Sequence, residues 1–397
     1  MNKLKLFISL VIAIIFTSCD NVLDLQEKPV DEERSTDFKI LLKDKTGSMN
    51  TLYGSDVVSN VEILVKSVNF STEYKATSDE NGMVTLPNIV SDSYLISAIR
   101  NMTSDEMEIL TGQRLGFYKL INSSNSLVDL SADSKDTTCI YLDNLLQESP
   151  LVISEIYACG PSGSGLYFHD KYVEIFNQTD SVKYLDGLII AVVYSNPSQG
   201  INFIDDPEYV HTKRVWKFPG SGKNYPIEPQ QFVVCAEDGI DHRINAPESI
   251  DLSSVSFEFY KDDAPDIDNP AVPNMIKIFQ STSEVDWLIG GEKGAIVLAQ
   301  IDQDSLKWYD EHLLIPYKNI IDGVEYIDDL TDVQYKILNS AIDASFTGGI
   351  TFYTGKSMER IAIERDGKYI MKDDNNSSLD FKVIDKPTPE YHYEIGN

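Results

Sequence analysis

The sequence predicts an all-β protein built from two β-sandwich domains, the second enlarged by loop insertions that include a short helix. Between residues 37 and 146 apolar side chains recur at alternate positions, as at Phe38, Ile40 and Leu42, which is the period of a strand with one buried face. Asn81-Gly82 supplies the positive φ values that a tight hairpin needs. The 397 residues are enough for two separate cores.

The N-terminus has the layout of a secretory signal. Lys3 and Lys5 precede an apolar run, Leu6–Phe16, that is shorter than the roughly 20 residues of a membrane-spanning helix. The small residues that follow and Cys19 resemble the lipobox of bacterial lipoproteins. The resemblance implies that residues 1–18 are a signal peptide and that Cys19 carries long acyl chains such as palmitate. Each buried methylene adds about 0.8 kcal/mol of membrane affinity, so several chains anchor the protein durably.

Residues 19–36 are acidic, polar and interrupted by proline, which indicates a flexible tether. An acidic stretch directly behind a lipidated cysteine resembles the surface-export signal of some Gram-negative lipoproteins. This resemblance implies an outer-membrane protein, lipid-anchored and exposed at the cell surface.

Residues 37–146 resemble the transthyretin-like and carboxypeptidase-regulatory-like β-sandwiches. In those domains a valine-rich strand leads into a D-x-x-G turn, a short strand and a later strand with a tyrosine. Asp79, Gly82, Leu86 and Tyr94 occupy these places. The resemblance implies a sandwich fold and says little about function.

Residues 150–397 begin with LVISEIY and DKYVEIFNQTDSVKYLDGLII, which resemble the opening strands of lamin-tail domains, an immunoglobulin-like sandwich. Ser357-Met358-Glu359-Arg360-Ile361 resembles the S-x-E-R strand of the same family. We expect few contacts across the junction at 147–150, since each sandwich should have its own core. The shared positions of the opening strands are Ile153, Glu155, Tyr172, Glu174, Asn177, Leu185, Asp186 and Gly187.

The second domain is about twice the length of a compact sandwich, and the excess lies in residues 195–209, 236–274 and 302–346. In the last of these, Thr331 and Gln334 form a capping-box pattern, which predicts a short helix. Its apolar face would be formed by Val333, Ile337, Ala341 and Ile342.

The formal net charge of −30 argues against nucleic acid as a partner, because so acidic a surface repels phosphate backbones. Once Cys19 is lipidated, Cys139, Cys159 and Cys235 remain, so at most one disulfide can form and its pairing is open. No CxxC pattern or Cys/His cluster is present, and we expect no cofactor.

Acidic residues supply two candidate sites. Asp262, Asp263, Asp266 and Asp268 offer enough oxygen ligands for a calcium-stiffened loop, although Pro270 and Val272 depart from the EF-hand pattern and a solvated acidic loop is the alternative. Glu155 and Glu174 lie on predicted strands, where a pair of carboxylates could act as general acid and base. We interpret these two as structural acids that accept hydrogen bonds, because the resembled sandwich has glutamate at the same positions.

In this order, the two domains resemble a family of Gram-negative surface lipoproteins. The resemblance implies a noncatalytic protein that binds a ligand or partner, as an accessory to an outer-membrane transporter in nutrient uptake. Two alternatives stay open: a secreted hydrolase, since lamin-tail sandwiches accompany nucleases and phosphoesterases, and a structural or adhesive envelope module. We expect the binding surface within residues 236–346, with at most half of the aromatic rings exposed among Phe257, Phe259, Tyr260, Trp287 and Trp308.

Overall fold

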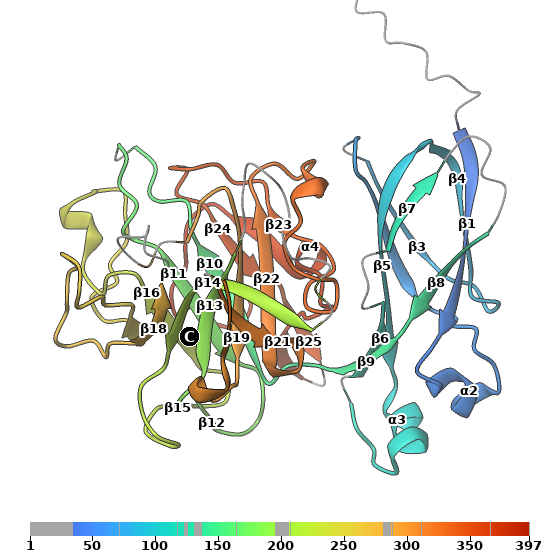
Figure 1. Ribbon diagram of the computed structural model, residues 1–397, viewed down its shortest axis with the longest axis horizontal. Helices are drawn as coiled ribbons and strands as arrows, with labels where there is room; N and C mark the ends of the chain where they lie inside the picture. The colour runs from blue at the N-terminus through green and yellow to red at the C-terminus, as the bar shows by residue number, and fades with distance from the viewer. Residues whose placement is uncertain are drawn as a thin grey trace, which may run out of the picture.

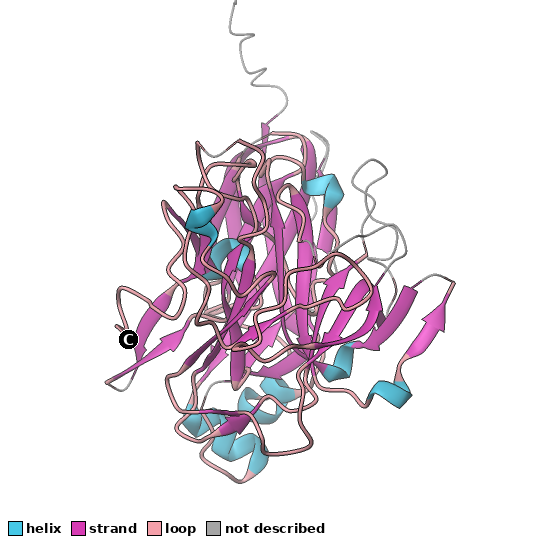
Figure 2. Ribbon diagram, turned by 90° about the vertical axis from the view of Figure 1, so that its left-hand side faces the viewer, coloured by secondary structure: helices cyan, strands magenta, loops and turns pink. Residues whose placement is uncertain are grey.

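Two β-rich modules lie side by side in the structure, which is a computed structural model (Figure 1). Strands dominate both modules, and the short helices lie at their periphery (Figure 2). The all-β fold class predicted from the sequence is therefore confirmed. None of the described helices is long and apolar enough to cross a membrane. The structure describes residues 35–396 except 71, 117, 123–125, 131–136, 164, 195–205, 207, 281–286, 288, 311 and 366. The signal peptide, Cys19 and nearly all of the tether lie outside these residues.

The first module is a sandwich of two sheets around one core. One sheet has the strand order β4-β1-β8, and the other has the order β3-β2-β5-β6-β9, with β7 also paired to β5. The short helices α2 (Ser48–Tyr53) and α3 (Ser104–Thr111) lie at one end. The strands are β1 (Ser35–Asp44), β2 (Glu62–Ser67), β3 (Glu73–Thr77), β4 (Met83–Val90), β5 (Asp92–Met102), β6 (Tyr118–Ile121), β7 (Ser126–Leu130), β8 (Thr138–Leu142) and β9 (Asn144–Gln147).

The turn at Asp79–Gly82 connects two sheets, which corrects the expectation of a hairpin. Asp79 Oδ1 accepts hydrogen bonds from the backbone N–H groups of Asn81 and Met83, both at 2.8 Å, and Gly82 has a φ of 68°. A Cβ at Gly82 would lie 2.6 Å from the side chain of Val57. The tight turn is present, but β3 pairs with β2 whereas β4 pairs with β1.

The second module is a larger sandwich. Its six-stranded sheet has the order β17-β16-β11-β10-β24-β27, and its eight-stranded sheet has the order β20-β21-β14-β13-β19-β22-β23, with β18 also paired to β14. The main core between the sheets includes the fully buried Trp216 and Trp287. A further core on the outer face of the larger sheet is covered by Ile337, Leu338 and Ile342.

The strands of the second module are β10 (Leu151–Tyr157), β11 (Tyr172–Asn177), β12 (Lys183–Tyr184), β13 (Ile189–Val193), β14 (Tyr209–Lys217), β15 (Pro226–Ile227), β16 (Phe232–Ala236), β17 (Phe257–Glu258), β18 (Ile276–Gln280), β19 (Lys293–Ala299), β20 (Lys307–Tyr309), β21 (His312–Pro316), β22 (Ile320–Ile327), β23 (Thr347–Gly348), β24 (Ser357–Arg360), β25 (Ala362–Arg365), β26 (Lys368–Met371) and β27 (Phe381–Ile384). Strands β12 and β15 form a small sheet, as do β25 and β26. A short helix, α4 (Ser377–Asp380), precedes β27.

The helix predicted from Thr331 onward is wrong: only one 3-10 turn, Val333–Tyr335, forms there. Thr331 Oγ1 donates to Asp329 Oδ1 at 2.7 Å and does not cap a helix. The buried carboxylate of Glu325 accepts from the backbone N–H of Leu338 at 2.8 Å and from Lys336 Nζ at 3.0 Å. These tertiary hydrogen bonds take the place of the helical ones, because a buried carboxylate without partners would be costly.

The junction between the modules is held more tightly than its sequence predicts. Lys119 Nζ, from β6, lies 2.9 Å from Glu148 Oε1 and 3.2 Å from Asp374 Oδ1, and all three side chains are largely buried. Arg365 pairs with the same Glu148 at 2.9 Å. Buried Leu95 of the first module packs in one cluster with Ile327, Val333 and Phe346 of the second. These contacts fix the orientation of the two modules.

Candidate functional site

Within the described part of the insertions, the most exposed aromatic rings lie on the hairpin formed by β20 and β21, at one edge of the eight-stranded sheet. Trp308 is 62% exposed and Tyr309 is 53% exposed. Asp310, directly after β20, has a φ of 51°, in the left-handed region that turns allow. We call this part of the chain, residues 307–316, the aromatic hairpin.

Each exposed ring is braced by a ring on another strand of the same sheet. Trp308 meets Phe279 of β18 edge to face, with ring centroids 4.9 Å apart. Tyr309 meets His211 of β14 in the same manner at 5.2 Å. Side chains alternate along a strand, so the two rings lie on opposite faces of β20. Bracing restricts the rotamers of both rings before any partner arrives, which lowers the entropic cost of binding.

Behind Tyr309 lies a cluster of imidazole and phenol rings. His211 and His312 have ring centroids 5.9 Å apart, and the ring of His312 lies 3.8 Å from that of Tyr194. His211 Nε2 is 2.9 Å from Asp206 Oδ2. Burial alone would raise the pKa of Asp206, but the hydrogen bonds from His211 and from backbone N–H groups outweigh it and lower that pKa. The cluster is buried behind Tyr309 and supports its ring.

Most of the five aromatic residues named in the sequence analysis are buried, as expected. Phe257, Phe259 and Trp287 are buried, and Phe259 stacks on Trp287 with ring centroids 3.6 Å apart. Tyr260 is half-buried, and Trp308 is exposed. The expectation that at most half are exposed is confirmed. Sequence reasoning missed Tyr309, His211 and His312, which strand pairing brings together from β14 and the hairpin.

The four calcium candidates lie in one loop, but each is engaged differently. Asp263 Oδ1 pairs with Lys277 Nζ at 2.6 Å, Asp266 Oδ2 accepts from the backbone N–H of Lys261 at 2.7 Å, and Asp268 Oδ1 accepts from Asn274 Nδ2 at 2.9 Å. Asp262 is exposed. These aspartates are not among the described residues that bring three potential metal ligands within 4.8 Å of one another.

Glu359, His392 and Glu394 are the one such group in the part of the chain that the structure describes. Lys382 Nζ lies 3.0 Å from Glu359 Oε2 and 2.8 Å from Glu394 Oε1. The imidazole of His392 faces the backbone oxygen of Arg360 through Nε2 at 2.9 Å and Glu394 Oε2 through Nδ1 at 2.7 Å. A lysine ammonium stands between the two carboxylates, where a metal ion would have to sit. The group is an ion-pair cluster that holds the C-terminal segment on the sheet.

Glu155 and Glu174 accept hydrogen bonds from the C-terminal segment, as the structural interpretation predicts. The backbone N–H of Thr388 lies 3.2 Å from Glu155 Oε1, and the N–H of Glu390 lies 2.6 Å from Glu174 Oε2. Burial raises the pKa of Glu155 to about 7. Burial, and then the nearby charge of Glu155, raise the pKa of Glu174 well above its usual range. Both carboxyls fasten the last residues of the chain across β10 and β11.

We predict that the protein becomes less stable as the pH rises from about 5 to 8. Burial also raises the pKa values of Glu258 and Glu325 to about 7. Folded pKa values above the unfolded ones mean that the folded state binds more protons. This contribution to stability is complete below the unfolded pKa, roughly 4.3, and is lost as the pH rises through about 7. Urea unfolding at intervals of pH should show the midpoint falling over this range.

Glu174→Gln should reduce this pH dependence. The amide resembles the protonated acid, because its NH₂ group can donate to Ser154 Oγ while its oxygen accepts from the N–H of Glu390. Asp180→Asn, at an exposed carboxylate, is the control and should leave the slope unchanged. A midpoint that rises with pH across the same range would contradict the prediction.

All three remaining cysteines are free. Cys159 and Cys235 are buried and Cys139 is half-buried. Burial, then the charge of Glu174, raise the pKa of the Cys235 thiol well above its usual range, so it is a poor nucleophile.

A family model described as a protein of unknown function (DUF4876) matches residues 228–388. Among solved structures, the chain is similar to a DUF4876 family protein from Bacteroides thetaiotaomicron VPI-5482, with 23% identity, a TM-score of 0.55 and coverage of 87% of this chain and 94% of that chain. It is also similar to shaft pilin spaA from Lactobacillus rhamnosus GG, with 10% identity, a TM-score of 0.19 and coverage of 71% of this chain and 92% of that chain. No curated protein matches the chain. The first similarity shows a shared fold, and the second is too distant to support an argument.

Proposed function

We propose that this protein is a noncatalytic lipoprotein of the outer-membrane surface, and that its aromatic hairpin binds a β-barrel transporter as an accessory to nutrient uptake. The observation that supports binding is the pair of braced, exposed rings, Trp308 and Tyr309, on an edge strand. Tyrosine and tryptophan are the side chains on which binding energy most often concentrates at protein interfaces. The transporter as partner rests on the resemblance to surface lipoproteins.

The lipid anchor is the second part of the proposal. A chain with a net charge of −30 is repelled by anionic headgroups, so electrostatic attraction cannot hold it at a membrane. Acyl chains on Cys19 supply the attachment that the folded surface lacks. The tether of residues 19–36 then lets the two modules reach a neighbouring membrane protein.

We predict that Trp308→Ala with Tyr309→Ala reduces recovery of a β-barrel transporter about 30-fold or more. Two central aromatic rings removed from an interface cost about 2 kcal/mol or more, which converts to this factor. The measurement is quantitative mass spectrometry of the lipidated protein purified from cross-linked outer membranes. Tyr393→Ala is the matched control, because Tyr393 is 72% exposed but lies in the C-terminal segment.

Equal recovery of the transporter with the double variant and the wild type would contradict the role of the aromatic hairpin. Circular dichroism should match the wild type in every variant, since both rings are mostly exposed and their loss leaves the core intact. Recovery of no membrane partner, together with hydrolysis of a phosphoester or glycoside by the wild type, would overturn the proposal in favour of a hydrolase.

A further inference from the structure

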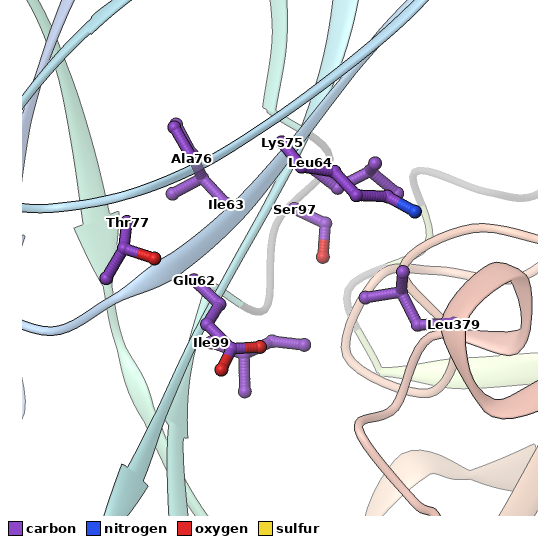
Figure 3. A pocket seen from close by; sticks show the side chains of 9 residues that line it. All are labelled: Glu62, Ile63, Leu64, Lys75, Ala76, Thr77, Ser97, Ile99 and Leu379. Carbon is purple, nitrogen blue, oxygen red and sulfur yellow. The ribbon is translucent and has the colours of Figure 1, made fainter.

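A groove with a volume of about 260 Å³ lies where the two modules meet, and its lining shares no residue with the aromatic hairpin. Its floor is formed by β2, β3 and β5 of the first module, and Leu379 of α4 approaches it from the second module (Figure 3). A cavity at the interface between two modules is a common place for a ligand site.

Strand register determines which side chains form the floor. Alternate residues, such as Ile63 and Val65 of β2, point into the core of the first module. The other set faces the second module in cross-strand rows. The first row is Thr77–Glu62–Ile99, and the second is Lys75–Leu64–Ser97. A third row, Glu73–Lys66–Leu95, follows along the same strands.

The second module covers the third row and contacts Ser97 of the second row, while Glu62, Lys75 and Thr77 of the first two rows stay exposed. Leu95 is buried in the cluster with Phe346, and Lys66 Nζ lies 4.3 Å from the centroid of the Phe346 ring. Asn376 Nδ2 donates to Ser97 Oγ at 3.0 Å across the interface. The buried Lys119–Asp374 pair holds the same two modules. These contacts fix the width of the groove, so a ligand meets a preformed site.

The groove is lined by apolar side chains at its centre and by one acidic and one basic side chain, Glu62 and Lys75. Leu64 and Ile99 are buried at 4% and 5% exposure, and Leu379 approaches from the opposite side. Glu62 and Lys75 occupy diagonally adjacent positions in the first two rows. Glu62 has no ion-pair partner among the residues that the structure describes. Lys75 pairs with Glu73 at 3.0 Å, but both groups are exposed and such pairs contribute at most about 1 kcal/mol, so a ligand carboxylate can displace Glu73.

Ser97 adds a hydrogen-bond donor at the floor. It is 4% exposed and lines the groove. Its oxygen accepts the proton of Asn376, and within the described part of the chain its own hydroxyl proton has no acceptor. That proton is available to a carbonyl oxygen of a ligand.

We propose that this groove binds a short peptide with free termini and an aliphatic side chain. The ammonium group of the peptide pairs with Glu62, its carboxylate pairs with Lys75, and its peptide carbonyl accepts from Ser97. The side chain packs on Leu64, Ile99 and Leu379. The volume, below the roughly 300–1,000 Å³ of most ligand pockets, favours a dipeptide over a longer chain. The strong negative charge of the protein disfavours anions, so a zwitterion suits the groove better than an acid.

The test is isothermal titration calorimetry of the full lipidated chain in detergent with L-leucyl-L-leucine. We expect saturable one-to-one binding with Kd below about 1 mM. N-acetylation of the dipeptide should weaken binding at least about tenfold by removing the charge that Glu62 recognises, and C-terminal amidation should do the same for Lys75. Absence of saturable binding by the wild type, or equal binding of the capped dipeptides, would overturn the proposal.

Two variants test which side chain of the groove recognises each terminus of the dipeptide. Glu62→Gln should abolish the discrimination against the N-acetylated dipeptide while keeping that against the amide, and Lys75→Met should do the reverse. Lys39→Met, at an exposed lysine of β1, is the control and should bind like the wild type. Discrimination that survives in both groove variants would place the dipeptide elsewhere. Glu62 and Lys75 are exposed, so both variants should fold. No transporter takes part, so the result is independent of the proposed role of the aromatic hairpin.

Discussion

Replacing Arg360 with methionine is expected to destabilise the second module by about 3–5 kcal/mol, a large part of the 5–15 kcal/mol that a typical domain has. Arg360 is 1% exposed. Its Nη2 donates to Asp322 Oδ2 at 2.6 Å, its Nε to the backbone oxygen of Ile153 at 2.7 Å, and its Nη1 to that of Lys372 at 3.1 Å. The guanidinium thereby joins β10, β22 and β24.

The loss of stability in the Arg360→Met variant comes from the buried carboxyl groups that Arg360 pairs with in the wild type. Asp322 is buried, and burial raises its pKa to about 6 although Arg360 opposes the rise. Asp373 and Asp380 also lie within 4.0 Å of the guanidinium. Without Arg360 these carboxyls would lose their shared cation, and a buried charge with no partner is strongly unfavourable. Urea denaturation followed by tryptophan fluorescence would measure the effect, since Trp216 and Trp287 are in the core of this module.

Arg243→Met is the matched control. Arg243 pairs with Asp241 and Asp251 at 2.7 Å each, but its side chain is 52% exposed. Its loss should change the free energy of unfolding by less than about 1 kcal/mol. Equal stability of the Arg360→Met and Arg243→Met variants would contradict the prediction, because it would mean that burial does not increase the contribution of an arginine network to stability.

Cys19→Ala is expected to abolish acylation and release the protein from the membrane. Only Cys19 follows the apolar run of the N-terminus directly. Without acyl chains, the net charge of −30 works against retention of the protein on anionic lipid. Metabolic labelling with an alkyne fatty acid, followed by membrane fractionation, measures both effects.

Cys139→Ala is the control for this experiment, because Cys139 is a free and partly accessible thiol. It should retain the full label. Label that persists on Cys19→Ala would mean that the protein is not a lipoprotein of the expected kind, whatever the position of the remaining label.

Alternation of apolar residues was enough to predict the strands and which of their residues are buried. Phe38, Ile40 and Leu42 are all in the core of the first module, as their spacing predicts. The interpretation of Glu155 and Glu174 as structural acids follows from the resemblance to lamin-tail domains, and the chain supplies their hydrogen-bond donors from its own C-terminal segment. Periodicity is a property of neighbouring residues, so the sequence shows it directly.

Contacts between residues far apart in the sequence decided the features that the sequence did not predict. The pattern at residues 331–342 favours a helix by local rules, but the backbone N–H groups of Ile337 and Leu338 donate to Glu325 of β22 instead. Trp287 and Trp308 lie in the same stretch of insertions, yet one is in the core and the other is on an edge strand. Local sequence does not distinguish them, because burial depends on which strand lies alongside.

The sequence by itself therefore determined an all-β chain and which residues would form many of its strands, since these follow from the period of side chains along one strand. Only the tertiary structure decided where a partner or ligand could bind. The support behind Tyr309 exists because β14 pairs with β21, which brings His211 and His312 to the same edge. The groove exists because Asn376 and Ser97, which are far apart in the sequence, meet across two modules. Such sites depend on contacts between distant residues, and the pattern of one segment carries no record of them.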